Sequence, residues 1–277
     1  MDGQNGIYSG DATVLRQERY APDCLKMTLR IPTRRRFDAG QFVHIRCGES
    51  TFPLLRRPFS VWDARPAARG GQDVDLLYTV VGAGTRVLAG HGPRSSVGLM
   101  GPLGVGFHAD PDADVFLFVA GGVGVVPFYL FARQIRAGGL SAPMILLFGA
   151  RTKSMLYGID DFAGVDVEAH AATEDGSRGR RGLVTDLLAD FLRRARGWNV
   201  RMHACGPEGM LERVARLAER RHVPCEVNLE KRMGCALGAC GACVQKVWAD
   251  DGKDWRYSRI CHEGPTYDAR KLIMKER

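Results

Sequence analysis

Four cysteines near the C-terminus constrain this 277-residue chain more than any other feature. Cys235, Cys240 and Cys243 fall within a short run of Gly and Ala, and Cys261 follows, giving the spacing C-x4-C-x2-C-x17-C. A cluster of two irons bridged by sulfide needs four thiolates wrapped around it, and this spacing supplies them largely from one loop. The pattern therefore predicts a [2Fe–2S] site with these four cysteines as its ligands.

Glycines in the same loop suit that chemistry. Gly234, Gly238 and Gly241 let the backbone approach the sulfurs and aim N–H groups at them. A four-cysteine zinc site is the main alternative, although zinc knuckles usually show two C-x2-C pairs and here Cys261 stands alone. Merely structural cysteines are the remaining alternative. Three further cysteines in strand-like surroundings are interpreted as ordinary core residues: Cys24, Cys47 and Cys225.

Hydrophobic patterning divides the chain into three expected domains, 1–110, 111–224 and 225–277. The first contains five or six short apolar runs punctuated by Pro and Gly, which predicts a small β-barrel of the Greek-key type. The second alternates apolar strands with helix-compatible stretches, which is typical of an open parallel sheet. The third holds the cysteines and little apolar material, so a metal centre would supply the stability that its small core lacks.

Charge and composition exclude several function classes. The formal net charge of +8 is spread along the chain without a basic tail, which argues against nucleic-acid binding. The polar N-terminus predicts no secretion signal, and the uncharged stretch 115–132 contains three glycines and a proline, so we expect a strand, turn and helix instead of a membrane span. We expect a cytoplasmic protein whose eight cysteines stay reduced.

Two Gly-rich turns follow buried strands in the second domain. The first, with Gly121, Gly122, Gly124 and Pro127, would expose backbone N–H groups at a helix start, where a pyrophosphate can sit. It departs from the Rossmann G-x-G-x-x-G pattern because Pro127 occupies the place of the third glycine. The second turn is Cys205–Gly206–Pro207, at the carboxyl end of a strand, where open α/β sheets bind ligands.

The barrel segment carries two further motifs. An arginine pair ends at Arg57, directly before Pro58, Phe59 and Ser60, and a guanidinium fork suits a bidentate phosphate contact. Downstream, Gly82, Gly84 and Thr85 form a turn into a possible helix that Thr85 can cap. Each motif alone is also compatible with a solvated charge pair or an ordinary helix cap.

Taken in this order, the motifs resemble those of the ferredoxin–NADP reductase superfamily. Its flavin motif R-x-[YF]-S matches residues 57–60, with Phe in place of the commoner Tyr; its G-x-G-T, G-G-x-G-x-x-P and C-G-P motifs match residues 82–85, 121–127 and 205–207. The resemblance implies FAD on the barrel and NAD on the α/β domain. It implies that Arg57, Gly84 and Thr85 hold the FAD phosphates, that Leu77, Tyr78 and Thr79 run beside the flavin, and that Ser60 and Cys205 lie at the hydride-transfer site.

With the cysteine segment added, residues 7–265 resemble the electron-transfer subunits of dihydroorotate dehydrogenase B. That resemblance implies an FMN-containing catalytic subunit as partner, in a heterotetramer with two copies of each, and electron flow from dihydroorotate to NAD⁺. Flavin subunits of hydrogenases and transhydrogenases have the same order of domains, so they are alternative assignments. A stand-alone reductase and a zinc-stabilised binding module are two further alternatives. Four arginines could instead accept the 2′-phosphate of NADP: Arg151, Arg178, Arg180 and Arg181.

Overall fold

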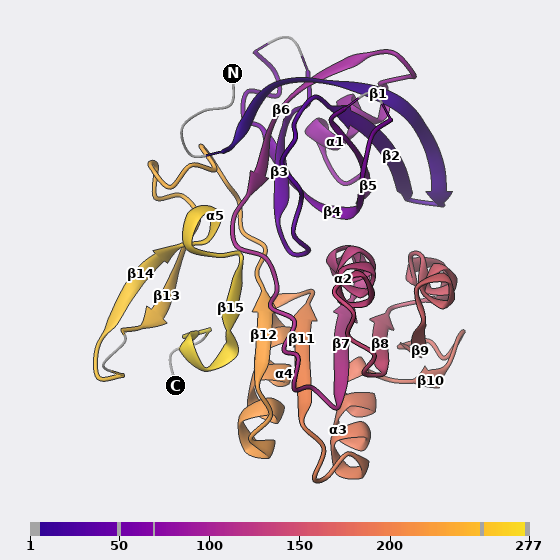
Figure 1. The fold of residues 1–277 in the computed structure, drawn as a ribbon, viewed down its shortest axis with the longest axis vertical. Coiled ribbons are helices and arrows are strands. Elements are labelled where there is room, and N and C mark those ends of the chain that lie inside the picture. The colour runs from indigo at the N-terminus through magenta and orange to yellow at the C-terminus, as the bar shows by residue number, and fades with distance from the viewer. Residues whose placement is uncertain (1–5, 49–50, 69, 250–251, 275–277) are drawn as a thin grey trace.

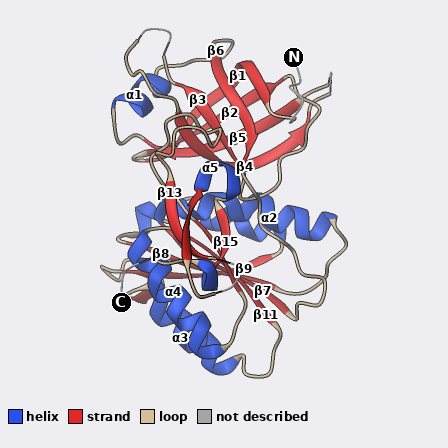
Figure 2. Ribbon diagram, turned by 90° about the vertical axis from the view of Figure 1, so that its left-hand side faces the viewer, coloured by secondary structure: helices blue, strands red, loops and turns tan. Residues whose placement is uncertain are grey.

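The computed structural model describes residues 6–48, 51–68, 70–249 and 252–274. A β-barrel lies above a β-sheet flanked by helices, and the C-terminal segment lies beside both (Figure 1). The turned view in Figure 2 shows the same stacking of barrel on sheet.

Six strands of the described chain close into the barrel, in the order β1-β2-β5-β4-β3-β6. Neighbouring strands are antiparallel, and their order departs from the chain order as in a Greek key. The predicted N-terminal barrel is therefore confirmed. Its strands are β1 (Tyr8–Ala21), β2 (Cys24–Ile31), β3 (Phe42–Arg46), β4 (Arg57–Pro66), β5 (Gln72–Thr79) and β6 (Ser96–Leu103), with helix α1 (Ala83–Ala89) after β5.

The second sheet, within the described residues, has the order β10-β9-β8-β7-β11-β12-β15. All its pairs are parallel except β12 with β15. The sheet continues past residue 224, because β12 pairs with β11 and β15 returns from the C-terminal segment. Its strands are β7 (Val115–Gly121), β8 (Met144–Ala150), β9 (Val167–Thr173), β10 (Arg180–Arg181), β11 (Val200–Cys205), β12 (Cys225–Asn228) and β15 (Thr266–Asp268).

Helices cover both faces of this sheet, because its central strand is apolar on both sides. Phe116 and Phe118 of β7 pack into a core shared with the barrel, whereas Leu117 and Val119 pack against the helices of the opposite face. The covering helices are α2 (Val126–Ala137), α3 (Val184–Arg194) and α4 (Glu208–Arg221). The short helix α5 (Ile260–Glu263) belongs to the C-terminal segment, and the 3₁₀ turns are η1 (Gly122–Val125), η2 (Lys153–Met155), η3 (Ile159–Val165) and η4 (Ala269–Lys271).

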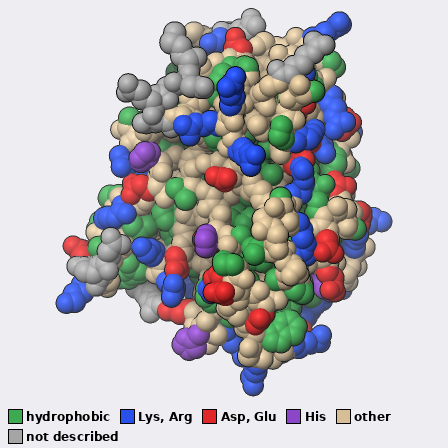
Figure 3. Space-filling view, in the orientation of Figure 1, with side chains coloured by type: hydrophobic (Ala, Val, Ile, Leu, Met, Phe, Trp, Pro, Cys, Tyr) green, Lys and Arg blue, Asp and Glu red, His purple; other side chains and the backbone are tan. Residues whose placement is uncertain are grey.

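The uncharged stretch 115–132 forms β7, η1 and the start of α2, as predicted. Among the residues that the structure describes, no helix is long and apolar enough to cross a membrane. On the face shown in Figure 3, basic side chains are scattered among acidic ones and form no single stripe.

The C-terminal segment is attached to both other parts. Its hairpin consists of β13 (Val244–Trp248) and β14 (Trp255–Arg259). The buried Asn228 amide at the end of β12 donates to Gly40 O of the barrel (3.0 Å) and to Thr266 Oγ1 of β15 (2.9 Å). One side chain thus connects barrel, sheet and C-terminal segment.

Candidate flavin, nicotinamide and cluster sites

The flavin motif opens strand β4, and the structure brings it against the second barrel motif. Gly84 is buried, and a Cβ at this position would lie 3.1 Å from Arg57 Nε and 3.2 Å from Arg57 Cγ. The absence of a side chain at Gly84 thus lets Arg57 pack closely against this turn. A cation and the backbone N–H groups at the start of α1 therefore come together, which suits a phosphate.

Thr85 shapes that turn. Its hydroxyl accepts the N–H groups of Val81 (3.0 Å) and Gly82 (3.1 Å) and donates to Gly82 O (3.1 Å). The sequence predicts Thr85 as a cap, whereas Gly82 is the N-cap and Thr85 lies in the first turn of α1, with its hydroxyl bonded back to Gly82 and committed to the loop. Any phosphate contact from this motif would come from the backbone N–H groups that the hydroxyl holds in place.

The rest of the flavin motif lies beside strand β5, which carries residues 77–79. Phe59 is buried and packs edge-to-face on Tyr78, with ring centroids 5.4 Å apart. The Tyr78 hydroxyl donates to Gln17 Oε1 of β1 (2.7 Å), and this hydrogen bond holds the Tyr78 ring in place against Phe59. Half-buried Ser60 pairs with Phe42 across strands β3 and β4. Ser60 is thus the partly accessible residue of this group, beside the buried rings of Phe59 and Tyr78.

The two Gly-rich turns of the sheet meet at the carboxyl ends of β7 and β11. A Cβ on Gly124 would lie 2.4 Å from Cys205 O, and a Cβ on Gly121 would lie 2.8 Å from Pro207 Cδ. Gly206 has φ +154° and packs on the Gly121 backbone, so neither turn tolerates a side chain here. Close backbone packing at a helix start is the arrangement that admits a pyrophosphate.

Cys205 lies completely buried beneath this turn. Burial raises the pKa of its thiol well above the usual value, and the Glu230 carboxylate adds to that increase. The side chain is therefore a neutral thiol. Glu230 itself is solvent-exposed but crowded by surrounding protein, and this desolvation raises its pKa. Sequence reasoning missed Glu230 because one acidic residue after a strand carries no pattern.

Backbone N–H groups of the cysteine loop donate hydrogen bonds to the cysteine sulfurs, as we predicted from its glycines. Gly238 N donates to Cys261 Sγ (3.2 Å), and the N–H groups of Leu237 and Cys240 donate to Cys235 Sγ (3.4 Å each). Gly238 has φ +79°, and a Cβ on Gly234 would lie 3.0 Å from Cys240 Sγ. These contacts form a cradle for thiolates, which fits an iron–sulfur cluster.

The four thiols lie as two pairs. The backbone N–H of Cys235 donates to Cys240 Sγ (3.4 Å), and that of Cys261 donates to Cys243 Sγ (3.5 Å). In the described parts of the chain, no three thiol, imidazole or carboxylate groups surround one point as ligands of a single ion would. Two thiolate pairs supply the ligand set of two bridged irons.

The pairs differ in exposure. Cys243 and Cys261 are buried, whereas Cys235 is half-buried and Cys240 exposed. Burial raises the pKa of Cys261 to about 12, while the Leu237 N–H, ahead of other backbone donors, lowers the pKa of Cys235 to about 6. One end of the predicted cluster thus faces the interior and the other faces solvent beside Leu237, which is 49% exposed.

Two of the four arginines considered as ligands for the 2′-phosphate of NADP form ion pairs with carboxylates. Arg178 makes a two-point contact with Asp160, and Arg180 pairs with Asp190. Both guanidinium groups therefore already face carboxylates. The cysteines interpreted as core residues, Cys24, Cys47 and Cys225, are indeed buried.

Comparisons with known proteins agree with this arrangement. A family model for the iron–sulfur cluster binding domain of dihydroorotate dehydrogenase B matches residues 230–273, and a model for the oxidoreductase NAD-binding domain matches residues 118–216. The electron transfer subunit of dihydroorotate dehydrogenase B (NAD(+)) from Bacillus caldolyticus is 38% identical over 237 residues, covering 85% of this chain and 86% of the relative. The same subunit from Desulforamulus reducens is 34% identical over 268 residues, covering 96% and 98%.

A solved structure of an NADH-dependent reduced ferredoxin–NADP oxidoreductase, a protein of flavin-based electron bifurcation, has the same fold. Its TM-score is 0.80 and its sequence identity 27%, covering 95% of this chain and 90% of that one.

Fold and site together define an NAD-dependent oxidoreductase subunit with a flavin-type barrel and an attached iron–sulfur domain. The chain belongs to the family of electron transfer subunits of dihydroorotate dehydrogenase B. Its cofactors are FAD, NAD and an iron–sulfur cluster, and it exchanges electrons between NAD(H) and a catalytic partner subunit.

Proposed function

We propose that the partner is an FMN-containing dihydroorotate dehydrogenase catalytic subunit, joined in a heterotetramer with two copies of each chain in the cytoplasm. Dihydroorotate would be oxidised on the partner, and NAD⁺ would be reduced on this chain. The relatives' names and the match over residues 230–273 support this proposal. The observation that carries it is the exposed Cys240 at the outer end of the cysteine loop, where a partner can reach the cluster.

We assign the residues to roles as follows. Arg57 and the backbone around Gly82, Gly84 and Thr85 bind the FAD pyrophosphate, while Phe59, Ser60 and residues 77–79 line the flavin ring. The turn at 121–127 binds the NAD pyrophosphate, and Cys205, Gly206 and Pro207 support the nicotinamide end from beneath. The four cysteines bind a [2Fe–2S] cluster.

When bound, FAD accepts a hydride from nicotinamide or gives one to it, and the cluster carries single electrons. The role of the protein is to orient the cofactors: its barrel and sheet hold the flavin and nicotinamide rings next to each other. We propose that the functional units follow the expected division 1–110, 111–224 and 225–277, with the third sharing two strands with the second.

The test is to co-express this chain with a dihydroorotate dehydrogenase catalytic subunit from the same organism and purify the complex anaerobically. We expect FAD, FMN and two irons per cluster site, together with dihydroorotate-dependent reduction of NAD⁺. A complex that contains zinc and no iron would overturn the cluster assignment. Failure of the two chains to associate would overturn the partner assignment.

A second candidate is the flavin subunit of a transhydrogenase, favoured by the match to the NADH-dependent ferredoxin–NADP oxidoreductase over 95% of this chain. That candidate predicts association with an NADPH-binding partner and NADPH production from NADH and reduced ferredoxin. The same co-purification distinguishes the two partners.

A further inference from the structure

The strand that carries the flavin motif touches the helix that carries the nicotinamide turn. Strand β4 starts at Arg57 and runs on to Trp62 and Asp63. Helix α2 starts just after the Gly-rich turn and runs on to Tyr129 and Arg133. In Figure 1, α2 lies between the barrel and the sheet, directly below β4. The two elements therefore connect the segment that carries the flavin motif to the segment that carries the nicotinamide turn.

An aromatic stack forms one half of this contact. Trp62 is 1% exposed and lies parallel to Tyr129, with ring centroids 4.7 Å apart and 12° between the planes. Phe162 of η3 packs edge-to-face on both rings, at 5.7 Å and 5.8 Å. A Cβ on Gly158 would lie 2.6 Å from Trp62 Cη2, so the sheet domain closes tightly around the indole.

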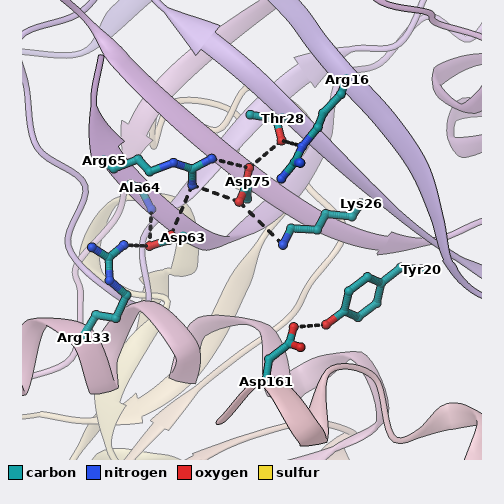
Figure 4. Close-up of polar contacts among 10 residues, drawn as sticks. All are labelled: Arg16, Tyr20, Lys26, Thr28, Asp63, Ala64, Arg65, Asp75, Arg133 and Asp161. Atoms are coloured by element: carbon teal, nitrogen blue, oxygen red, sulfur yellow. Dashed lines mark hydrogen bonds and ion pairs between the residues drawn. The ribbon is translucent and has the colours of Figure 1, made fainter. Parts of the chain in front are cut away.

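Charged groups form the other half (Figure 4). Arg133 of α2 donates to Asp63 Oδ1, and the Asp63 side chain is only 11% exposed. The other Asp63 oxygen lies 3.2 Å from Arg65, which also holds Asp75 at 3.0 Å. Lys26 and Thr28 complete the surroundings of Asp75 inside the barrel. Arg133 is therefore attached to a carboxylate that the barrel itself holds rigidly.

We propose that Trp62, Tyr129, Asp63 and Arg133 are positioning residues for hydride transfer, which set the distance and angle between the flavin and nicotinamide rings. This proposal rests on the proposed function. Neither pair lies within the motifs that bind the cofactors, and each joins a barrel residue to a residue of α2. Tyr20 of β1, which donates to Asp161 of η3, is a further link between the same two domains.

The expected consequence is loss of rate without loss of binding. A misplacement of about 1 Å between reacting atoms can slow a reaction about 100-fold. Weakening this contact leaves both cofactor motifs intact, so the affinities for FAD and NADH should change less than about twofold. The hydride step should slow by roughly 10-fold in a charge variant and up to about 100-fold in a stack variant.

The chain offers a matched pair of variants on one helix. Arg133→Gln removes the link to the barrel. Arg136→Gln, one turn further along α2, removes an ion pair with Asp166 and hydrogen bonds to Leu140 O and Ala142 O, all of which belong to the sheet domain. Both remove a partly exposed arginine from an ion pair, but only the first breaks a connection between domains. Trp62→Leu is compared in the same way with Trp198→Leu, whose indole is 55% exposed.

Two measurements decide the outcome. Hydrogen exchange of the cofactor-free chain should show faster exchange in residues 57–66 for Arg133→Gln and no change there for Arg136→Gln. Single-turnover reduction of bound FAD by NADH, and by NADH deuterated at the transferred position, should be slower with a larger isotope effect only in Arg133→Gln and Trp62→Leu.

The proposal is overturned if Arg133→Gln matches Arg136→Gln in both measurements. Should Trp62→Leu not fold, Tyr129→Leu serves for the stack. Wild-type protein that binds no FAD or is not reduced by NADH would refute the proposed function, and the exchange measurement would still decide whether the β4–α2 contact holds the domains together.

Discussion

The barrel-and-sheet body and the C-terminal cluster segment (229–274) are stabilised by different means. In the body, strand β7 is completely buried, and aromatic rings such as Phe118 and Phe128 stack 5.2 Å apart beside it. In the cluster segment, two of the few buried apolar side chains are the ligand candidates Cys243 and Cys261. The body therefore depends on apolar burial, whereas the segment depends on its thiolates and on its attachments to the body.

Loss of one cluster ligand should separate the two regions most clearly. We expect Cys240→Ser to damage the cluster, because a serine hydroxyl is harder to deprotonate than a thiol. Electron exchange with the partner should fall more than about 100-fold, while reduction of ferricyanide by NADH, which can draw electrons from the flavin, should stay within about twofold.

Iron analysis and the two activities are measured side by side. Ala242→Ser is the control, since it adds the same hydroxyl to the same exposed loop and removes no ligand. Partner reduction at the wild-type rate in Cys240→Ser would show that the cluster is not on the electron path.

The converse change should affect the body and spare the cluster. Arg57→Ala removes a charge-assisted contact to the FAD pyrophosphate, which costs about 2–3 kcal/mol or roughly 30–150-fold in FAD affinity. Iron content should not change. FAD affinity is measured by fluorescence titration of the deflavinated protein, with the exposed Arg36→Ala as control. Equal affinities in the two variants would contradict the flavin site.

Lowering the pH should reduce the stability of the body before its carboxylates begin to be protonated. His203 is buried among Phe107, Phe118 and Phe131, with Glu226 Oε2 3.5 Å from its Nε2, and desolvation lowers its pKa to about 4. Since the unfolded imidazole titrates near 6.5, the unfolded state binds more protons between pH 6.5 and 4, and stability falls as pH falls through this window. The loss at pH 5 is about 2 kcal/mol for this one group.

Denaturant unfolding of His203→Phe at pH 8 and pH 5 measures the effect. The variant loses the contact between Nε2 and His108 O, so its stability at pH 8 should be lower, but its fall between the two pH values should be smaller. The partly exposed His170→Gln should keep the full wild-type fall. An unchanged pH dependence in His203→Phe would refute this account.

The smallest effect concerns the choice between NADH and NADPH. We expect a preference for NADH, because Arg178 and Arg180 already face Asp160 and Asp190. Asp160→Ala frees Arg178 and should raise kcat/KM for NADPH by no more than about fivefold, since an exposed ion pair contributes up to about 1 kcal/mol. Steady-state rates with ferricyanide test this. A wild-type preference for NADPH would overturn the assignment.

The same contrast explains what could be predicted from sequence. The barrel, the parallel sheet and the two Gly-rich turns at strand ends follow from local patterns, because period, glycine and strand ends act over short distances. The cysteine ligands follow from spacing alone. Trp62, Tyr129 and Asp63 could not be selected, since their role arises from a contact between domains. The return of residues 266–268 to the sheet was missed for the same reason: so short a strand has no pattern of its own.

That return has a consequence for assembly. Because β15 pairs with β12, residues 229–265 form a loop whose two ends are anchored side by side in one sheet. Closing such a loop costs chain entropy. Binding of four thiolates to one inorganic centre would offset part of this cost, because it holds the loop together. Binding of a cluster by these cysteines would therefore favour the pairing of β15 with β12 at the sheet edge.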